Sequence, residues 1–437
     1  MQERGRKILL VLGAGVSGLA AALAAGAPVF EAACVPGGIC SSYFVRPGQS
    51  EVLSQCPPDQ EAYHFEVGGG HWIFGGDATV LRFIESVTPL RRYQRVSSVY
   101  FRGSDRYVPY PLQNHLRCLD EETRSRALAE VVRPEGPSNT MNQWLERNFG
   151  PALSGLFFKP FHDLYTAGLS ETIAPQDGYK SPVDVGLAVR GALHDTPAVG
   201  YNAEFVYPED GLNSLAQRMA ARCDVRYGKQ AISIDAKAHV VHFADGAAER
   251  YERLLATLPL NRLIELCGLV MEQPADPYTS VLVLNIGAER GRKCPGDHWL
   301  YNPDAKSGFH RVGFYSNVDR MFLPLCARDS GSHVGIYVER AYRGGARPAA
   351  SEIASYSKAV VAELQEWGYI NGVDVAHPTW IDVAYTWRWP GSRWRDAALR
   401  LLESYDIYPV GRYARWIFQG IADSIRDGFY SGVSLRC

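Results

Sequence analysis

The sequence predicts an α/β fold in which a Rossmann-like parallel sheet is combined with an inserted helical domain and an antiparallel sheet. Three features lead to this prediction. A short apolar run, a glycine-rich turn and a run of helix formers follow one another near the N-terminus. Residues 115–200 have a mostly helical pattern, and apolar runs at 279–286, 309–315 and 333–339 are separated by turn residues. At 437 residues, the chain exceeds what one hydrophobic core usually supports.

The N-terminal pattern is a β-α-β unit. Residues 8–12 form an apolar run that is too short for a helix but suits a buried parallel strand. Residues 19–25 are helix formers that stop at Gly26, and residues 28–31 predict a second strand ending in Glu31. A glycine-rich turn joins the first strand to the helix.

This turn has the spacing of a dinucleotide-binding motif. A diphosphate needs backbone N–H groups at a helix N-terminus and a chain that can approach it closely. We expect Gly13 to make the tight turn, Gly15 to leave room for the diphosphate, and Gly18 to let helix and strand pack. The motif alone is weak evidence, but here it follows a strand, opens a helix and precedes an acid. The cofactor contacts expected in this unit are Gly13, Gly15, Val16, Ser17, Gly18, Glu31 and Ala32.

The acid and the segment after it favour FAD as the cofactor. Glu31 is placed to accept hydrogen bonds from an adenosine ribose, which disfavours the 2′-phosphate of NADP. Gly37 and Gly38 follow in a turn that can approach the same diphosphate. This pair favours FAD over NAD, and a plain surface turn is the alternative interpretation of these two glycines.

Composition argues against several other classes of protein. The formal net charge of −2, from 45 basic and 47 acidic residues, gives no global field that attracts nucleic acid or an anionic membrane. Nine cysteines occur singly, without zinc-site spacing, and indicate reduced thiols and no metal site. No apolar stretch approaches the ~18 residues of a membrane span, and the glycine spacing in the first apolar run argues against an export signal. We therefore expect a cytoplasmic protein that binds neither nucleic acid nor a membrane.

Further motifs are spread over nearly the whole chain. These are Gly-Gly-His-Trp-Ile-Phe at 69–74, Val-Pro-Tyr-Pro-Leu-Gln-Asn at 108–114, Trp-Leu-Tyr at 299–301, Phe-His-Arg at 309–311, Ser-Asn at 316–317 and Gly-Arg-Tyr at 411–413. Together with the glycines and the acid above, these segments resemble the UDP-galactopyranose mutases of the flavin amine oxidase superfamily, particularly the longer eukaryotic type.

The resemblance implies a discontinuous FAD-binding domain of the GR2 type at 1–75, 201–265 and 396–437. A mainly helical insertion would occupy 76–200, and an antiparallel-sheet substrate domain 266–395. It also implies an isomerase that interconverts pyranose and furanose forms of a nucleotide-activated sugar, with N5 of reduced FAD attacking the anomeric carbon. A reductant such as NAD(P)H or a reductase would keep the flavin reduced, and a homo-oligomer is compatible with the family.

Site residues are carried over from the family by position. His71 would lie at the flavin, Arg311 at the diphosphate of the substrate, and Arg412 beside the flavin or the sugar phosphates; these three form the expected catalytic set. Further cofactor contacts are expected at Gly37, Gly38, Gly70, His71, Gly411, Asp423 and Ser424. Substrate contacts are expected at Gln113, Asn114, Lys180, Trp299, Tyr301, Arg311, Asn317, Trp389 and Phe418.

Some positions depart from the family pattern. Trp389 and Phe418 stand where the family has two tyrosines at the diphosphate, so two hydroxyl donors are lost. Lys180 is the basic residue nearest to the position of a family arginine in the helical domain, and Val318 replaces a tyrosine. These changes affect the expected substrate pocket and leave the FAD motif intact.

Two other functions remain open at this point. The runner-up is an FAD-dependent oxidase or dehydrogenase acting on a small amine or alcohol, and the third is a flavin-binding protein without catalysis. A mutase predicts that Arg311 and Arg412 converge on one anion site, whereas an oxidase predicts an apolar or aromatic cage. Each of these residues also has a structural interpretation. Arg311 could form a structural ion pair, and His71 could be an ordinary loop residue. Gln113 could be a turn residue, and Trp299 and Tyr301 could serve sheet packing.

Overall fold

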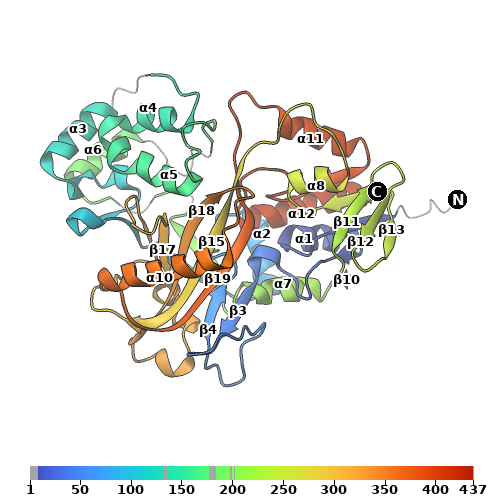
Figure 1. Cartoon of the computed structure of the whole chain (residues 1–437), viewed down its shortest axis with the longest axis horizontal. Helices are drawn as coiled ribbons and strands as arrows, with labels where there is room; N and C mark the ends of the chain where they lie inside the picture. The colour runs from blue at the N-terminus through green and yellow to red at the C-terminus, as the bar shows by residue number, and fades with distance from the viewer. Residues whose placement is uncertain (1–7, 132–135, 177–183, 197–198, 201, 437) are drawn as a thin grey trace.

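The computed structural model describes residues 8–131, 136–176, 184–196, 199–200 and 202–436. It has three parts (Figure 1). A group of helices lies at the upper left, a large sheet occupies the centre, and a parallel sheet with its flanking helices lies at the right. The α/β fold class expected from the sequence is confirmed.

The parallel sheet joins segments that are far apart in the sequence. All four of its strand pairs are parallel. In spatial order its strands are β10 (Val225–Arg226), β2 (Val29–Phe30), β1 (Leu9–Leu12), β14 (Arg253–Ala256) and β20 (Ile407–Pro409). The expected N-terminal β-α-β unit supplies β1, α1 (Val16–Ala25) and β2.

Helix α1 consists mostly of small residues and packs against strands of this sheet. α1 packs against the last helix, α12 (Ile421–Leu435), and against α7 (Leu212–Ala220). A Cβ on Gly428 of α12 would lie 2.3 Å from the carbonyl oxygen of Ser17, and one on Gly432 would lie 2.3 Å from that of Ala21. The absence of side chains at these two glycines therefore sets how closely α12 approaches α1.

A small antiparallel sheet and two helices extend this part of the molecule. The sheet contains β11 (Ala231–Asp235), β12 (Val240–Phe243) and β13 (Ala248–Arg250). The helices are α8 (Leu260–Leu266) and α11 (Trp394–Glu403). Their buried side chains share one core with strands β1 and β14.

The large sheet has seven strands and is antiparallel except for one pair. In spatial order its strands are β19 (Ile370–Thr386), β15 (Tyr278–Arg290), β18 (His333–Arg343), β17 (Arg311–Phe314), β16 (Trp299–Tyr301), β7 (Ser97–Phe101) and β8 (Arg106–Pro109). Only β16 and β7 are paired in parallel among these strands. The three strands expected near 279–286, 309–315 and 333–339 are β15, β17 and β18, and their antiparallel pairing is confirmed. Helix α10 (Ala350–Glu366) packs on one face of the sheet.

Two smaller sheets and short helical segments complete the fold. β3 (Ser42–Val45) pairs with β4 (Tyr63–Glu66), and β9 (Glu204–Pro208) pairs with both β5 (Ile73–Phe74) and β6 (Leu90–Gln94). Short helical segments here are α2 (Ala78–Val87) and α9 (Tyr315–Val318). Asp77 caps α2 by accepting hydrogen bonds from the backbone N–H groups of Thr79 and Val80, at 3.0 and 2.9 Å.

The helical part contains α3 (Glu121–Val131), α4 (Met141–Leu153), α5 (Lys159–Thr166) and α6 (Val185–Leu193). A π-helical turn, Ser154–Phe158, joins α4 to α5. This part starts later than the expected boundary at residue 76, because β6, β7 and β8 fall within 76–200 and join neighbouring sheets. All five residues of β7 are buried, and this strand pairs with both β8 and β16. In the described part of the chain, no helix combines the length and hydropathy required to span a membrane.

The contact between α1 and α12 can be tested with Gly428→Ala. The added methyl group would collide with the backbone of α1, so the variant should lose about 1–3 kcal/mol of unfolding free energy, the usual cost of overpacking. Urea denaturation measures this loss. Gly155→Ala is the matched control, since a Cβ there meets no atom within 4 Å. An equal effect of the two substitutions would contradict the close packing.

Candidate active site

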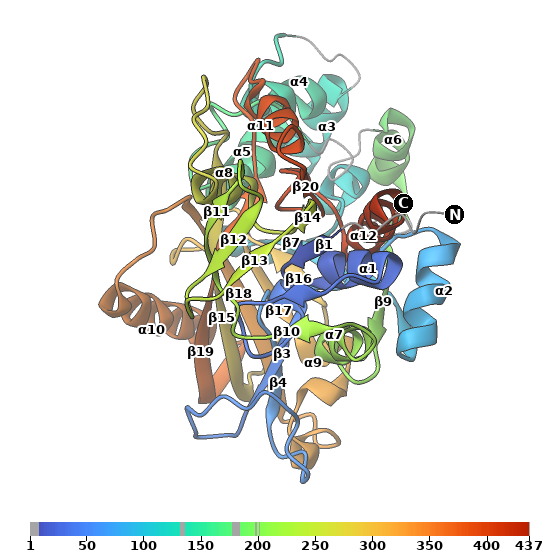
Figure 2. The ribbon, with the colours of Figure 1, turned by 90° about the vertical axis from the view of Figure 1, so that its right-hand side faces the viewer.

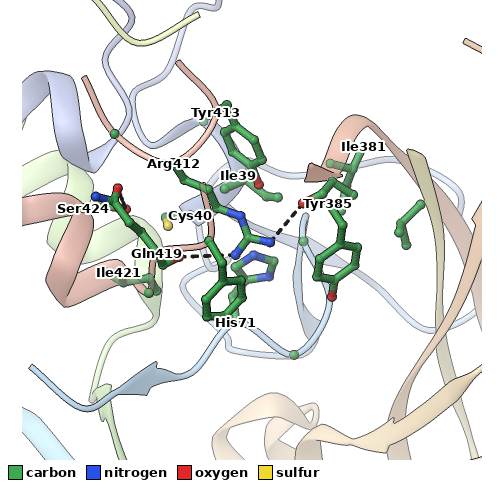
Figure 3. Close-up of a pocket in the computed structure, with 18 of the residues that line it drawn as sticks. Ile39, Cys40, His71, Ile381, Tyr385, Arg412, Tyr413, Gln419, Ile421 and Ser424 are labelled. Atoms are coloured by element: carbon green, nitrogen blue, oxygen red, sulfur yellow. Dashed lines mark hydrogen bonds between the residues drawn. The ribbon is translucent and has the colours of Figure 1, made fainter. Parts of the chain in front are cut away.

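A cavity of about 390 Å³ lies where the three parts meet. Residues of the parallel-sheet part, the large sheet and the helical part all line it. Figure 3 shows the end of the cavity around Arg412. The structure thereby brings together many of the residues expected at the site. Those lining the cavity are Gly13, Gly15, Val16, Ser17, Glu31, Gly37, Gly38, Gly70, His71, Tyr301, Arg311, Gly411, Arg412, Phe418 and Ser424.

The glycine-rich turn lines one end of the cavity, and its three glycines have different surroundings. Gly13 has φ +95°, and a Cβ there would lie 2.2 Å from Oγ1 of Thr257. A Cβ on Gly18 would lie 2.0 Å from the carbonyl oxygen of Gly13. A Cβ on Gly15, in contrast, would meet only the carbonyl oxygen of Gly37, at 3.9 Å. Gly13 and Gly18 are thus required by the packing of the chain itself, whereas Gly15 leaves open space beside the first turn of α1.

Glu31 lies at the end of β2 and is held by the same turn. Its carboxylate accepts hydrogen bonds from the backbone N–H of Ala14, at 2.6 Å, and from that of Ala33, at 2.9 Å. A carboxylate has about four lone-pair sites, so these two bonds leave capacity for a hydroxyl donor. Ala32 is exposed and is not among the lining residues.

Arg412 is held in a fixed position at the centre of the view in Figure 3. Its guanidinium donates hydrogen bonds to the backbone carbonyls of Gln419, at 3.2 Å, and Ala384, at 3.0 Å. It also lies 5.3, 5.5 and 4.6 Å from the ring centres of Tyr385, Tyr413 and Phe418. The aromatic rings stabilise a positive charge at this point in the cavity.

His71 lies beside Arg412 (Figure 3). Burial and the positive charges of Arg412 and Arg311 together lower the pKa of His71 to about 4, against the opposing effect of Glu339. The imidazole is therefore neutral near pH 7. Its Nδ1 atom is buried without a hydrogen-bond partner, which carries a desolvation cost that a bound polar group would remove.

The N-terminal end of α12 also borders the cavity. Ser424 lines it, whereas Asp423 accepts hydrogen bonds from the backbone N–H of Gly420, at 3.4 Å, and from Arg426, at 2.9 Å. Asp423 thus caps α12 and is not among the lining residues. Gly411 has φ +84° and donates its N–H to the buried carboxylate of Asp427, at 2.8 Å.

Arg311 and Glu339 form an ion pair on neighbouring strands of the large sheet. Nη2 of Arg311 donates to both carboxylate oxygens, at 2.6 and 2.5 Å, and the Glu339 side chain is 2% exposed. Burial alone would raise the pKa of Glu339, but the charge of Arg311 and the nearby ring of His310 hold it at about 2. Nε of Arg311 is buried without a hydrogen-bond partner. Arg311 is therefore part of a structural ion pair and also lines the cavity.

The helical part contributes an aromatic wall. The lining residues from the π-helical turn and α5 are Phe157, Phe161, His162 and Tyr165. Tyr165 is packed 5.3 Å from the ring of His310 and 4.7 Å from that of Tyr385, so this wall is in direct contact with the large sheet. Among the described residues, the wall supplies no lysine or arginine to the cavity lining. Lys180, expected to bind substrate, lies outside the described residues.

Several expected substrate contacts are not among the lining residues. Gln113 and Asn114 lie in a short 3₁₀ turn and are 2% and 1% exposed. The backbone carbonyl of Asn114 accepts a hydrogen bond from Oγ1 of Thr196 at 2.6 Å, and Gly191 packs against the same backbone. These two residues connect the short turn to the segment around α6.

Three further expected contacts serve packing or loop structure. Trp299 is 2% exposed and packs edge-on against Phe74, with ring centres 6.2 Å apart. Nδ2 of Asn317 donates to the backbone carbonyls of Pro295 and Asp297, at 2.9 and 2.7 Å. The indole N–H of Trp389 donates to the carbonyl of Ala275 at 3.4 Å. None of these three side chains is among the residues that line the cavity.

Sequence reasoning missed other lining residues. Thr257 follows β14 at the carboxyl end of the parallel sheet, which is where such sheets bind their ligands. Its position directly after an apolar run could have indicated from the sequence that it lines the cavity. Cys40 lies shortly after the Gly37-Gly38 pair. Burial and the charge of Glu66 raise the pKa of Cys40 to about 12, against an opposing effect of Arg412. Its side chain therefore remains a protonated thiol near neutral pH. Glu339 and Tyr385 come from the middle or end of long strands and carry no local signal.

The described residues contain no cluster of three histidine, cysteine or acidic side chains suited to a metal ion. All eight cysteines within the described ranges are free thiols. The cavity lining includes glycine-rich backbone, two arginines, the carboxylates of Glu31 and Glu339, histidines and aromatic rings.

Comparison with solved structures identifies the fold. No protein-family model matches the chain. The fold is similar to that of a reduced UDP-galactopyranose mutase, with a TM-score of 0.82, 23% sequence identity, and coverage of 98% of this chain and 94% of the mutase. It is also similar to a protein from Exiguobacterium sp. 255-15 that is provisionally named a protoporphyrinogen oxidase, with a TM-score of 0.71, 15% identity and 98% coverage of both chains. Putrescine oxidase bound to putrescine gives a TM-score of 0.57 at 16% identity, again with 98% coverage of both chains.

These comparisons confirm the expected resemblance at the level of the fold. The chain shares its fold with a UDP-galactopyranose mutase, a provisionally named protoporphyrinogen oxidase and a putrescine oxidase. This fold occurs in a mutase and in oxidases, so the fold by itself assigns no activity to the chain.

The Arg311–Glu339 ion pair predicts a pH effect on stability. The folded pKa of Glu339, about 2, lies below the value of about 4.3 for an unfolded glutamate. The pair therefore contributes its full stability above pH ~4.3 and loses it as the pH falls toward ~2, a loss on the order of 3 kcal/mol.

Urea unfolding between pH 5 and pH 3 should show a steeper fall in stability for the wild-type chain than for Glu339→Gln. Glu366→Gln, at an exposed carboxylate on α10, is the control and should keep most of the wild-type slope. Parallel pH profiles of the wild type and Glu339→Gln would show that the carboxylate does not have a depressed pKa.

Proposed function

We propose that this chain is an FAD-dependent mutase that interconverts pyranose and furanose forms of a nucleotide-activated sugar. The observation that carries the proposal is that Arg311 and Arg412 line the same cavity as the glycine-rich turn. Arginine binds phosphate oxygens through paired, charge-assisted hydrogen bonds. Two arginines beside a dinucleotide-binding turn therefore suit a substrate that carries a diphosphate.

The residues present fit FAD. The open space at Gly15 and the N-terminal end of α1 suit a diphosphate, and Glu31 retains acceptor capacity for a ribose hydroxyl. The buried, unpartnered Nδ1 of His71 suits a polar edge of the cofactor. Reduced FAD would supply an electron-rich nucleophile for the anomeric carbon, with no net change in oxidation state.

The chain's own residues have distinct roles in this proposal. Arg311, oriented by Glu339, has its unpartnered Nε–H available for an oxygen of the diphosphate. Arg412 stabilises the negative charge that develops as the nucleotide diphosphate leaves. The aromatic wall formed by Phe157, Phe161 and Tyr165 excludes water from the sugar. Keeping the cofactor reduced requires NAD(P)H or a reductase as a partner.

An FAD-dependent oxidase acting on a small amine or alcohol is the second candidate. The supporting observation is the helical wall, whose described lining residues are aromatic or neutral and include no lysine or arginine. The charge of Arg311 is also offset by Glu339. A cavity with this wall suits a small substrate without a diphosphate. It corresponds to the aromatic cage expected for an oxidase.

Gly15→Val tests the cofactor site. The Cβ position is free of protein clashes and Gly15 has φ −70°, so the variant should fold, but its branched side chain would fill the space proposed for the diphosphate. We expect the flavin content after purification to fall at least about tenfold, because even ~1.4 kcal/mol of lost binding energy produces that change. Gly103→Val, at a position where a Cβ meets no atom within 4 Å, should keep its flavin. Normal flavin content in a folded Gly15→Val protein would exclude this site.

The dependence of activity on redox state separates the two candidate enzymes. Anaerobic reduction with dithionite or a nicotinamide should start conversion of a nucleotide sugar to its furanose isomer, without stoichiometric consumption of reductant. Chromatography of UDP-, GDP- and dTDP-sugars measures the conversion. If the oxidised enzyme instead produces peroxide from an amine or alcohol in air, and the reduced enzyme leaves every nucleotide sugar unchanged, the mutase proposal is wrong.

A further inference from the structure

A second site candidate lies on the other side of the large sheet. Figure 2 shows α10 on one side of β15, β18 and β19, with α1 and α12 on the opposite side. Neighbouring residues of a strand point to opposite faces, so Glu339 of β18 faces the cavity and Arg340 faces α10. A groove lies here between the first half of α10, Arg340 and the loop around Gly308. We call it the α10 groove.

Arg340 is the central cation of the α10 groove. Its guanidinium donates one hydrogen bond, from Nη1 to the carbonyl of Ser307 at 3.2 Å, and lies 5.1 Å from the ring centres of both Tyr342 and Tyr356. No carboxylate of the described residues lies within 4 Å of it. Arg340 is thus half-buried, held in place and without a counter-ion.

A buried hydroxyl provides an independent indication of a ligand. Tyr356 lines the groove, is 6% exposed, and its hydroxyl is buried without a hydrogen-bond partner. Burial of an unpaired hydroxyl costs free energy that an acceptor in the groove would recover. Because Tyr356 packs under Arg340, an acceptor that satisfies this hydroxyl would also lie close to the positive charge.

The rest of the groove is fixed in shape, and its second cation, Lys306, lies 3.4 Å from the carboxylate of Glu366. Glu363 accepts hydrogen bonds from the backbone N–H groups of Lys306 and Ser307, at 2.8 and 2.7 Å, and so holds the loop in place. The carboxylate of Glu352 accepts a hydrogen bond from the backbone N–H of Ala349, at 2.7 Å. The groove is also next to the N-terminus of the 17-residue helix α10, which carries partial positive charge.

We propose that the α10 groove binds the phosphate group of a small phosphorylated metabolite. Arg340 would make a charge-assisted hydrogen bond to a phosphate oxygen, and Tyr356 would donate its hydroxyl to another. The backbone N–H groups of the first turn of α10 would provide further donors. This site is separate from the cavity and does not depend on the function proposed for it.

The test uses the purified full-length chain with the cofactor that it retains. Its melting temperature is measured in inorganic phosphate and in pyrophosphate, against sodium chloride of the same ionic strength. We expect either anion to raise the melting temperature of the wild-type chain. Arg340→Gln should weaken the apparent affinity by about tenfold or more, in line with the loss of a charge-assisted hydrogen bond.

Three variants distinguish specific binding in the α10 groove from a general effect of charge. Tyr356→Phe removes only the unpartnered hydroxyl and should weaken binding, and Ser355→Glu should abolish it by repulsion while leaving Arg340 in place. Arg347→Gln removes an equal charge from an exposed arginine that lies over Trp380, and should bind the anion as the wild type does. The proposal is overturned if neither anion stabilises the wild type, or if Arg340→Gln and Arg347→Gln respond to the anions equally.

Discussion

The close approach of α1 to the parallel sheet and to α12 determines the geometry of the whole cavity. It requires small residues at several points: Gly18 against the backbone of Gly13, Gly13 against Thr257, and Gly428 against Ser17. These contacts bring together three segments that are hundreds of positions apart in the sequence. Side chains at these positions would move α1 outward and displace the turn on which the cofactor site depends. The open space at Gly15 lies within this tightly packed turn.

Electrostatics and shape divide the cavity into two regions. Around the glycine-rich turn, backbone N–H groups, Glu31 and the fixed cation Arg412 provide polar groups that are already oriented. Toward the helical part, the lining is aromatic, and the charge of Arg311 is largely neutralised by Glu339. In the function proposed here, the first region would hold the FAD cofactor and the second would select the substrate. Arg311 retains one unpartnered N–H in this second region.

The predictions from sequence agree with the structure where the arrangement depends on local contacts. The strand, turn and helix around Gly13 to Gly18 and the acid Glu31 follow one another in the chain, so their spacing alone fixes their arrangement. Glu339 and Tyr385 were missed because they reach the cavity through sheet pairing and helix packing over long sequence distances. Trp299 and Asn317 lie in segments that resemble the family, but their side chains are used for packing and for backbone hydrogen bonds. A residue type in a matching segment does not reveal which way its side chain points.

The central claim is that the cavity holds FAD on the glycine-rich turn, and the flavin content of the purified chain tests it most directly. The protein is expressed and purified without added cofactor, precipitated with acid, and the released flavin is identified by its absorbance and mass. The account predicts a yellow protein that releases FAD in a molar amount close to that of the chain, with no colour left in the pellet. A folded, colourless protein that neither contains FAD nor takes it up from solution would contradict the account.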